Sequence, residues 1–182
     1  MKYFIFLAYL IRHKWFVFRE CLRLGVPWQG LVHDISKFLP GEFSAYADYY
    51  QRLQLGNGEN TGLVAEDDSH ALAWLVHQKR NRHHWQWWVL YGDRAQPTIL
   101  PMPDRYIREM VADWRGAGMA QGQPDTIGWY RANRDRMLLH PATRNKVESL
   151  LGRYENQYLH RGASDYTPEP ELVFDGAYKV ST

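Results

Sequence analysis

Cysteine, net charge and long apolar runs are all scarce in this sequence. A single cysteine, Cys21, excludes a disulfide scaffold and a metal site built from cysteine alone. A formal net charge of +2 excludes a protein that coats nucleic acid through bulk positive charge, so nucleic acid is a disfavoured partner. No apolar run approaches the roughly 18 residues that a membrane span needs, and we expect no membrane partner.

The residues that are present describe one folded domain, rich in aromatic side chains and arginine. The 182 residues are 45% hydrophobic and 23% charged, which suffices for one core and is not typical of disorder. Arginine outnumbers lysine by 16 to 6; its planar guanidinium suits phosphate, although codon usage gives the same bias. The apolar stretch Tyr3–Ile11 resembles a signal peptide, but Arg12-His13-Lys14 interrupts it, so we expect a cytoplasmic protein.

The spacing of apolar residues and the positions of glycine and proline predict an all-α fold. We expect a single-domain helical bundle of about six to seven helices, without strands. The predicted helices span 2–23, 27–37, 40–55, 68–90, 103–116, 125–138 and 141 to about 160, with loops at 56–62 and 92–103. The domain is therefore expected to cover 1–160, followed by an irregular tail over 161–182.

The adjacent pair His33-Asp34 gives the sharpest chemical signal. On the expected helix 27–37, neighbouring side chains point about 100° apart, so an imidazole and a carboxylate can straddle one cation. This donor pair suits Zn, Mn, Fe or Co. A surface histidine beside a surface aspartate is the common alternative. The apolar neighbours Leu31, Val32 and Ile35 indicate burial instead, and a buried carboxylate needs a partner.

His13 and Asp113 are further candidates, because each lies among apolar residues of an expected helix. Each also has a structural alternative. His13 alone is typical of a core histidine with its hydrogen bonds satisfied. Asp113 is equally typical of an ion-pair partner for Arg108 or Arg115.

The order of His13, the pair His33-Asp34 and Asp113 on successive helices resembles the HD-domain superfamily of metal-dependent phosphohydrolases. The resemblance implies that these four residues ligate a metal ion and that Asp34 takes part in catalysis. The segment from His33 to Lys37 is similar to the His-Asp-x-x-Lys form, in which the lysine holds substrate phosphate or supports the site. The whole chain is also similar to an uncharacterised family of bacterial and phage proteins, which implies no activity.

Lys37 marks a departure from one branch of the HD nucleotidases, where a glutamate at that place assists the attacking water. This sequence cannot use that device, and Glu42 on the next helix is a candidate substitute. We interpret Glu42 instead as an acid that the helix dipole favours at the start of the helix 40–55.

Three histidines, His77, His83 and His84, lie close together in the expected helix 68–90. On that helix His77 and His84 share a face within about 20°, at a rise of about 10.5 Å, and His83 points elsewhere. This separation is too long for one ion but suits two ions about 3.5–4 Å apart. Some HD proteins add two such histidines, and some of those are di-iron oxygenases. The alternative is a basic face that meets an anionic substrate, formed by Lys79, Arg80, Arg82, His83 and His84.

Together these patterns predict a metal-dependent phosphohydrolase that uses one or two divalent ions of Mn, Fe, Co or Zn. Its expected substrate is a small phosphorylated molecule, most simply a nucleotide, held by Lys37, Arg80 and Arg82. Two alternatives stay open: an HD-type di-iron oxygenase that uses His77 and His84, and a non-catalytic metal-containing binding module. The sequence is also compatible with a homo-oligomer.

Overall fold

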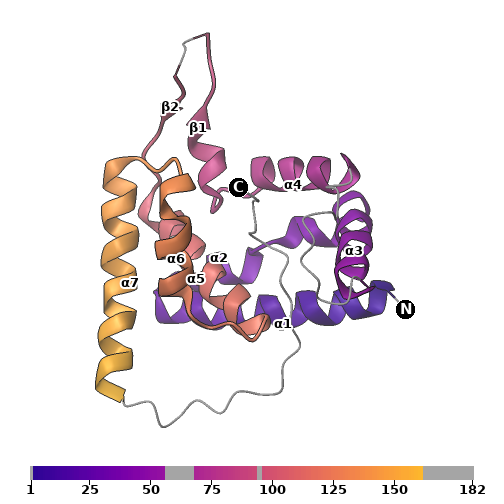
Figure 1. Cartoon of the computed structure of the whole chain (residues 1–182), viewed down its shortest axis with the longest axis horizontal. Helices are drawn as coiled ribbons and strands as arrows, with labels where there is room; N and C mark the ends of the chain where they lie inside the picture. Colours follow the sequence, from indigo (N-terminus) through magenta and orange to yellow (C-terminus); the bar gives the residue numbers. More distant parts are fainter. Residues whose placement is uncertain (1, 56–67, 94–95, 162–182) are drawn as a thin grey trace.

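The computed structural model describes residues 2–55, 68–93 and 96–161. In these ranges the chain forms seven α-helices, which confirms the expected all-α bundle (Figure 1). The α-helices are α1 (Lys2–Arg23), α2 (Pro27–Val32), α3 (Pro40–Leu55), α4 (Asp68–Arg80), α5 (Asp104–Ala120), α6 (Thr126–Asn133) and α7 (Pro141–Arg161). Three short 3-10 helices join them: η1 (Ile35–Phe38), η2 (Trp85–Trp88) and η3 (Arg134–Arg136).

The structure differs from the expected elements in five places, one of which is the expected helix 125–138, where α6 ends at Asn133 and η3 follows. The expected helix 27–37 breaks after Val32, and the expected helix 68–90 ends at Arg80. Helix α5 continues past residue 116 to Ala120. Strands β1 (Val89–Leu90) and β2 (Thr98–Ile99) pair antiparallel in a short hairpin that projects from the body, although no strand was expected (Figure 1). The predicted loop 56–62 and the tail from 162 lie outside the described residues.

Helix α1 runs across the molecule and organises the rest of the bundle (Figure 1). Helix α3 packs on the N-terminal part of α1 through a cluster of Phe6, Leu10 and Ala47, and α4 packs on α3. Helices α5, α6 and α7 share a second core that includes Met110, Tyr130 and Leu150. The candidate site lies between these two parts of the core. No helix in the described ranges is both long and apolar enough to cross a membrane.

Close contact between α1 and α5 depends on Gly116. A Cβ atom built at this position would lie 2.5 Å from Cγ2 and 2.7 Å from the backbone nitrogen of Val17. The backbones can therefore approach only because residue 116 has no side chain. This approach also sets the distance between α1, which carries His13, and α5, which carries Asp113.

We predict that Gly116→Ala lowers the free energy of unfolding by about 1–3 kcal/mol, because the added methyl group forces α1 and α5 apart. The matched control is Gly152→Ala in α7, where a Cβ atom meets no other atom within 4 Å. That substitution should raise the free energy of unfolding by up to about 1 kcal/mol. Denaturant titration of both variants measures the difference, and equal stabilities would contradict the close approach.

Candidate metal centre

Seven buried side chains from five parts of the chain converge between the two cores, in two groups that share Asp34. The first group is His13, His33, Asp34 and Asp113, and the second is Asp34, His77, His83 and His84. Within each group the ligand atoms lie within 4.8 Å of one another, close enough to surround one metal ion. The structure thus brings together all six residues expected as ligands and adds His83.

The two carboxylate oxygens of Asp34 face different groups. Its Oδ2 lies 3.3 Å from Nε2 of His33 and 3.7 Å from Nε2 of His13. Its Oδ1 lies 3.2 Å from Nε2 of His77 and 3.4 Å from Nε2 of His83. Asp113 completes the first group, with its Oδ1 at 3.3 Å from Nε2 of both His13 and His33. Such an arrangement lets one carboxylate bridge two ions.

The end of helix α2 places Asp34 in this position. Helix α2 ends at Val32, and Asp34 adopts a left-handed conformation with φ 52°, the one non-glycine residue with positive φ in the described ranges. The Nζ of Lys14 donates to the carbonyl oxygens of Leu31 at 2.9 Å and His33 at 2.7 Å, which holds the break against α1. A strained backbone of this kind is uncommon and clusters at functional sites.

The three histidines of the second group meet because α4 ends earlier than the sequence indicated. Nδ2 of Asn81 donates to the carbonyl oxygen of His77 at 2.9 Å, which satisfies the last turn of the helix. The amide of His84 then donates to the carbonyl oxygen of Asn81 at 3.2 Å, and this turn folds His83 and His84 back toward His77. The expectations of a continuous helix and of a His83 that points away from the face of His77 and His84 were therefore wrong.

Two buried glutamates contact the Nδ1 atoms of three candidate ligands, on the side of each ring away from Nε2. Oε1 of Glu109 lies 3.2 Å from Nδ1 of both His33 and His83, which belong to different groups. Oε2 of Glu42 lies 2.9 Å from Nδ1 of His77. A carboxylate on Nδ1 leaves Nε2 for a metal and fixes the orientation of the ring. Glu42 therefore orients a candidate ligand in addition to occupying the first turn of α3, where the sequence placed it.

The structure does not support the structural alternatives for His13, a core histidine with satisfied hydrogen bonds, and for Asp113, an ion-pair partner of Arg108 or Arg115. Arg115 instead pairs with Glu20 at 2.9 Å, and Arg108 pairs with Asp104. Neither ring nitrogen of His13 has a hydrogen-bond partner among the described residues. The basic-face alternative also fails for His83 and His84, because both are buried.

The electrostatics of the site reflect dense packing of opposite charges. Burial opposes charge on Asp34, yet the cations His33 and Lys37 outweigh it and hold the pKa of Asp34 well below its usual range. Burial likewise lowers the pKa of His33, but Asp34 and Asp113 outweigh it and raise that pKa well above its usual value. Burial and the neighbouring His83 lower the pKa of His84 well below its usual value, which leaves a neutral imidazole that can ligate a metal.

The buried atoms without partners coincide with the candidate ligand atoms. Among the described residues, no hydrogen-bond partner exists for Nε2 of His13, His33, His77, His83 and His84, or for Oδ1 of Asp34, whereas Oδ2 of Asp34 has Nζ of Lys37 at 2.7 Å. Buried polar atoms are nearly always paired, so a cluster of orphaned nitrogens and a carboxylate oxygen needs an explanation. Divalent ions bound by nitrogen and oxygen donors would satisfy these atoms, and the donor set suits Zn, Mn, Fe or Co.

Comparison with known proteins identifies a family but no activity. A family model described as a family of unknown function (DUF5662) matches residues 2–153. The chain belongs to this family. No curated protein and no solved structure matches the chain. The matched residues include every candidate ligand and both supporting glutamates.

Two of the three expected substrate-binding cations contact residues of the site. Nζ of Lys37 lies 2.7 Å from Oδ2 of Asp34, so this lysine contacts the shared carboxylate directly. Nη1 of Arg80 donates to Oε1 of Glu42 at 2.7 Å, with about half of the arginine side chain exposed. Arg82 is exposed, and its guanidinium lies over the ring of Trp87. Lys37 is therefore part of the centre and Arg80 lies at its rim beside Glu42, whereas Arg82 contacts Trp87 and Tyr106 rather than a candidate ligand.

We predict that the purified protein binds about two divalent ions per chain, one for each group. Asp34→Asn keeps the size of the side chain and tolerates the left-handed backbone, but it removes the shared charge and should reduce binding to well below one ion. His13→Ala and His84→Ala each disturb one group and should leave about one ion. Elemental analysis measures the content, with His140→Ala, outside both groups, as the control. Unchanged metal content in Asp34→Asn would contradict the shared role.

Metal uptake at neutral pH should release protons. The raised pKa of His33 means that its imidazole is protonated at pH 7 in the metal-free protein, and Nε2 must lose that proton before it can ligate an ion. The affinity for metal should therefore rise with pH. Addition of Mn or Co to weakly buffered metal-free protein with a pH indicator measures the release. Uptake without proton release at pH 7 would show that His33 is neutral or is not a ligand.

Proposed function

We propose that this protein is a metal-dependent phosphohydrolase whose two metal ions share Asp34. The observation that carries the proposal is the placement of the two oxygens of Asp34, each toward a separate group of buried histidine nitrogens without other partners. The resemblance of His13, His33, Asp34, Asp113 and Lys37 to the HD-domain pattern supports the same reading. The proposed substrate is a small phosphorylated molecule, most simply a nucleotide.

Divalent ions, when bound, polarise a phosphoryl group and lower the pKa of a coordinated water. The protein's part is to hold the ligands in fixed positions. Glu109 fixes the rings of His33 and His83, and Glu42 fixes the ring of His77, so the imidazoles need no rearrangement when substrate arrives. Burial of the ligands lowers the local dielectric, which strengthens every electrostatic interaction with a phosphate.

The cations at the rim fit an anionic substrate. The guanidinium of Arg80 is anchored at one end by Glu42 and remains about half exposed, so its fork can contact phosphate oxygens from a fixed position. Burial lowers the pKa of Lys37, but Asp34 outweighs burial and raises it, so the lysine stays charged. In the proposed reaction Lys37 balances the negative charge of phosphate and Asp34 together, while Arg80 and Arg82 bind the substrate at the edge.

The convergence of His77, His83 and His84 also supports a second candidate, the di-iron oxygenase. A centre with five histidines and two aspartates supplies the nitrogen-rich environment that iron accepts. The two candidates differ in their chemistry: a phosphohydrolase releases phosphate or a phosphomonoester without oxygen, whereas an oxygenase consumes dioxygen with iron bound. We favour the hydrolase because Lys37 contacts Asp34 and Arg80 contacts Glu42, so two cations lie beside the candidate ligands.

The activity test uses full-length protein loaded with Mn, Co or Fe and a panel of nucleoside mono-, di- and triphosphates and nitrophenyl phosphate esters. We expect metal-dependent release of phosphate or nitrophenol, reduced at least about 100-fold in Asp34→Asn, because the shared ligand is lost. His140→Ala should retain the activity of the wild type. No release from any substrate, with oxygen uptake by the iron-loaded protein, would favour the oxygenase instead.

A further inference from the structure

A stripe of exposed apolar side chains runs along α1 on the side away from the core. Phe4, Ile11, Trp15 and Leu22 are 77%, 56%, 58% and 50% exposed. Their spacing in the helix places them within about 40° of one another. The buried residues of the same helix, including Phe6, Leu10 and Val17, lie on the other side. Soluble surfaces rarely expose apolar residues in such a continuous row, so the stripe needs a partner.

The neighbouring segment extends this stripe into a wider surface. Exposed apolar side chains continue on α2 and η1: Trp28, Leu31, Val32, Ile35, Phe38 and Leu39. Helix α2 packs on α1 at Gly30, where an added Cβ atom would lie 3.0 Å from Cα of Phe18, and Nζ of Lys14 donates to the carbonyl oxygen of Leu31. These contacts place the two rows beside each other. We call this surface, formed by the stripe on α1 and the exposed apolar residues of α2 and η1, the α1–α2 apolar face.

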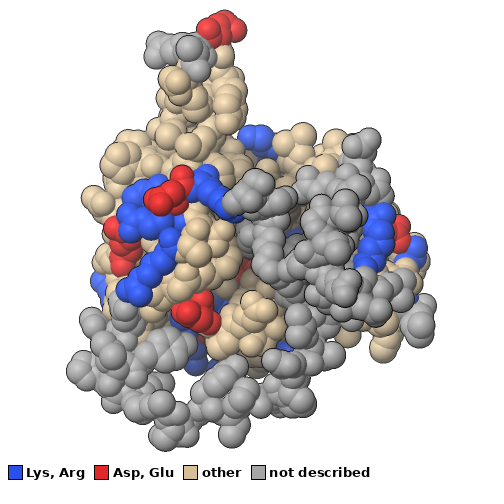
Figure 2. Space-filling model, viewed as in Figure 1, with Lys and Arg blue, Asp and Glu red and all other residues tan. Residues whose placement is uncertain are grey.

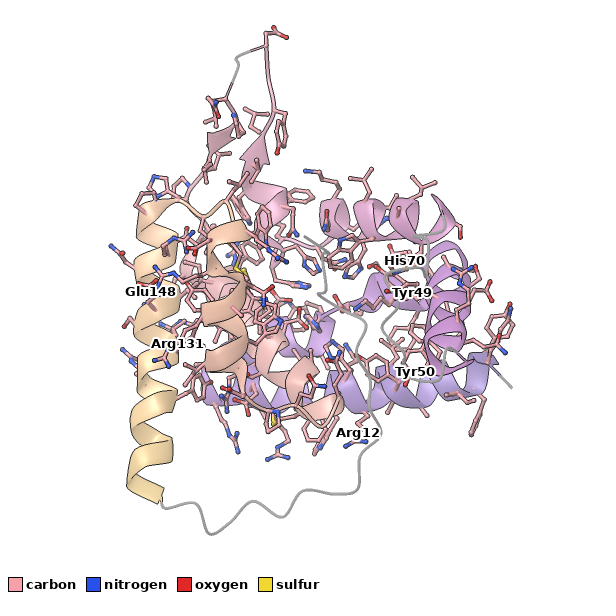
Figure 3. All side chains as sticks on the ribbon, viewed as in Figure 1. Arg12, Tyr49, Tyr50, His70, Arg131 and Glu148 are labelled. Atoms are coloured by element: carbon pink, nitrogen blue, oxygen red, sulfur yellow. The ribbon has the colours of Figure 1, made fainter. Side chains whose placement is uncertain are left out.

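Within residues 2–42, the segment that carries the α1–α2 apolar face, the exposed charges are of one sign. Residues 2–42 contain three acidic side chains, Glu20, Asp34 and Glu42, and each is at most 2% exposed. The cations Arg12 and Arg19 lie 5.8 and 6.0 Å from the ring of Phe16, and Arg12 is exposed and points away from the bundle (Figure 3). The exposed part of this segment is therefore apolar and cationic, without an exposed acid.

The arginines over α6 provide a contrast. Figure 2 shows Lys and Arg over this part of the surface with acidic residues among them. Arg134 there lies 3.1 Å from Glu148 and 3.8 Å from Asp135, so its charge is balanced within the protein. No acid within residues 2–42 balances Arg12 in this way, because Glu20 pairs with Arg23 and Arg115, Asp34 pairs with Lys37, and Glu42 pairs with Arg80.

We propose that the α1–α2 apolar face binds peripherally to a bilayer that contains anionic lipids. Apolar and aromatic side chains such as Trp15 and Trp28 enter the boundary between headgroups and acyl chains, and Arg12 and Arg19 contact the anionic headgroups. A second copy of the same face is a poorer partner, because it would bring cations against cations with no exposed acid to pair them. This proposal departs from the expectation that the protein has no membrane partner, and it does not rest on the proposed function.

The proposal is tested by flotation of the full chain with phosphatidylcholine vesicles, with and without phosphatidylserine. We expect binding to the phosphatidylserine vesicles that weakens as salt is raised. Ile11→Glu with Trp15→Glu should abolish binding, and Arg12→Gln alone should weaken it about fivefold, the effect of one cation near an anionic surface. The control is Leu90→Glu with Tyr91→Glu, at exposed apolar positions on the projecting hairpin, which should bind as the wild type does.

All substituted side chains are exposed, so each variant should fold as the wild type does. Circular dichroism and metal content of each variant check that it is folded. Failure of the wild type to float with either kind of vesicle would overturn the proposal, and so would unchanged binding by Ile11→Glu with Trp15→Glu. Light scattering supplies a further outcome. A dimer of the wild type that this double variant makes monomeric, without vesicle binding, would show that the face joins two copies of the chain and would also overturn the proposal.

Discussion

The carboxylate of Asp34 is the constraint on which the rest of the site depends. It is 2% exposed, lies in a left-handed turn, and presents one oxygen to each of two groups of imidazoles. A buried charge is costly unless it is paired, and here Lys37 pairs with it while the neighbouring histidines surround it. The fold supplies the remaining parts: the close approach of α1 and α5 at Gly116 brings His13 and Asp113 to the same side of Asp34.

Glu109 connects the two halves of the centre. One of its oxygens lies at equal distance from Nδ1 of His33 and of His83, so one carboxylate orients a candidate ligand in each group. Burial raises the pKa of Glu109, but the hydrogen bonds of the two histidines outweigh burial and lower it, so the carboxylate is charged. The two groups are consequently linked twice, through Asp34 between them and through Glu109 on the Nδ1 side of His33 and His83.

The sequence predicts the helical class and the first group well, and the second group only in part. His33-Asp34 and Asp113 are recognisable because polar side chains stand among apolar neighbours, which signals burial with partners. His83 could not be placed, because its position depends on the side chain of Asn81, which ends α4 and turns the chain back. Asn81 directly precedes Arg82-His83-His84 and is a residue type that can end a helix, a signal that the expected helix 68–90 passed over.

The glutamates were missed for a different reason. Glu109 precedes Asp113 by four residues and so shares its helical face, a signal that the spacing does contain. Its role is set by the distances to His33 and His83, which arise only when α5 packs against the rest of the bundle. Glu42 was correctly placed in the first turn of α3, yet its contact with His77 depends on how α3 meets α4. Local sequence patterns determine where helices form, whereas the contacts of Glu42 and Glu109 with the histidines come from the packing of helices against one another.

The most direct test of the shared carboxylate is anomalous diffraction from crystals of the protein loaded with manganese or cobalt. The account predicts two anomalous peaks about 3.5–4 Å apart, one beside each oxygen of Asp34, with His13, His33 and Asp113 around the first and His77, His83 and His84 around the second. A single peak bound by one group, or full occupancy by ions that Asp34 does not contact, would contradict it.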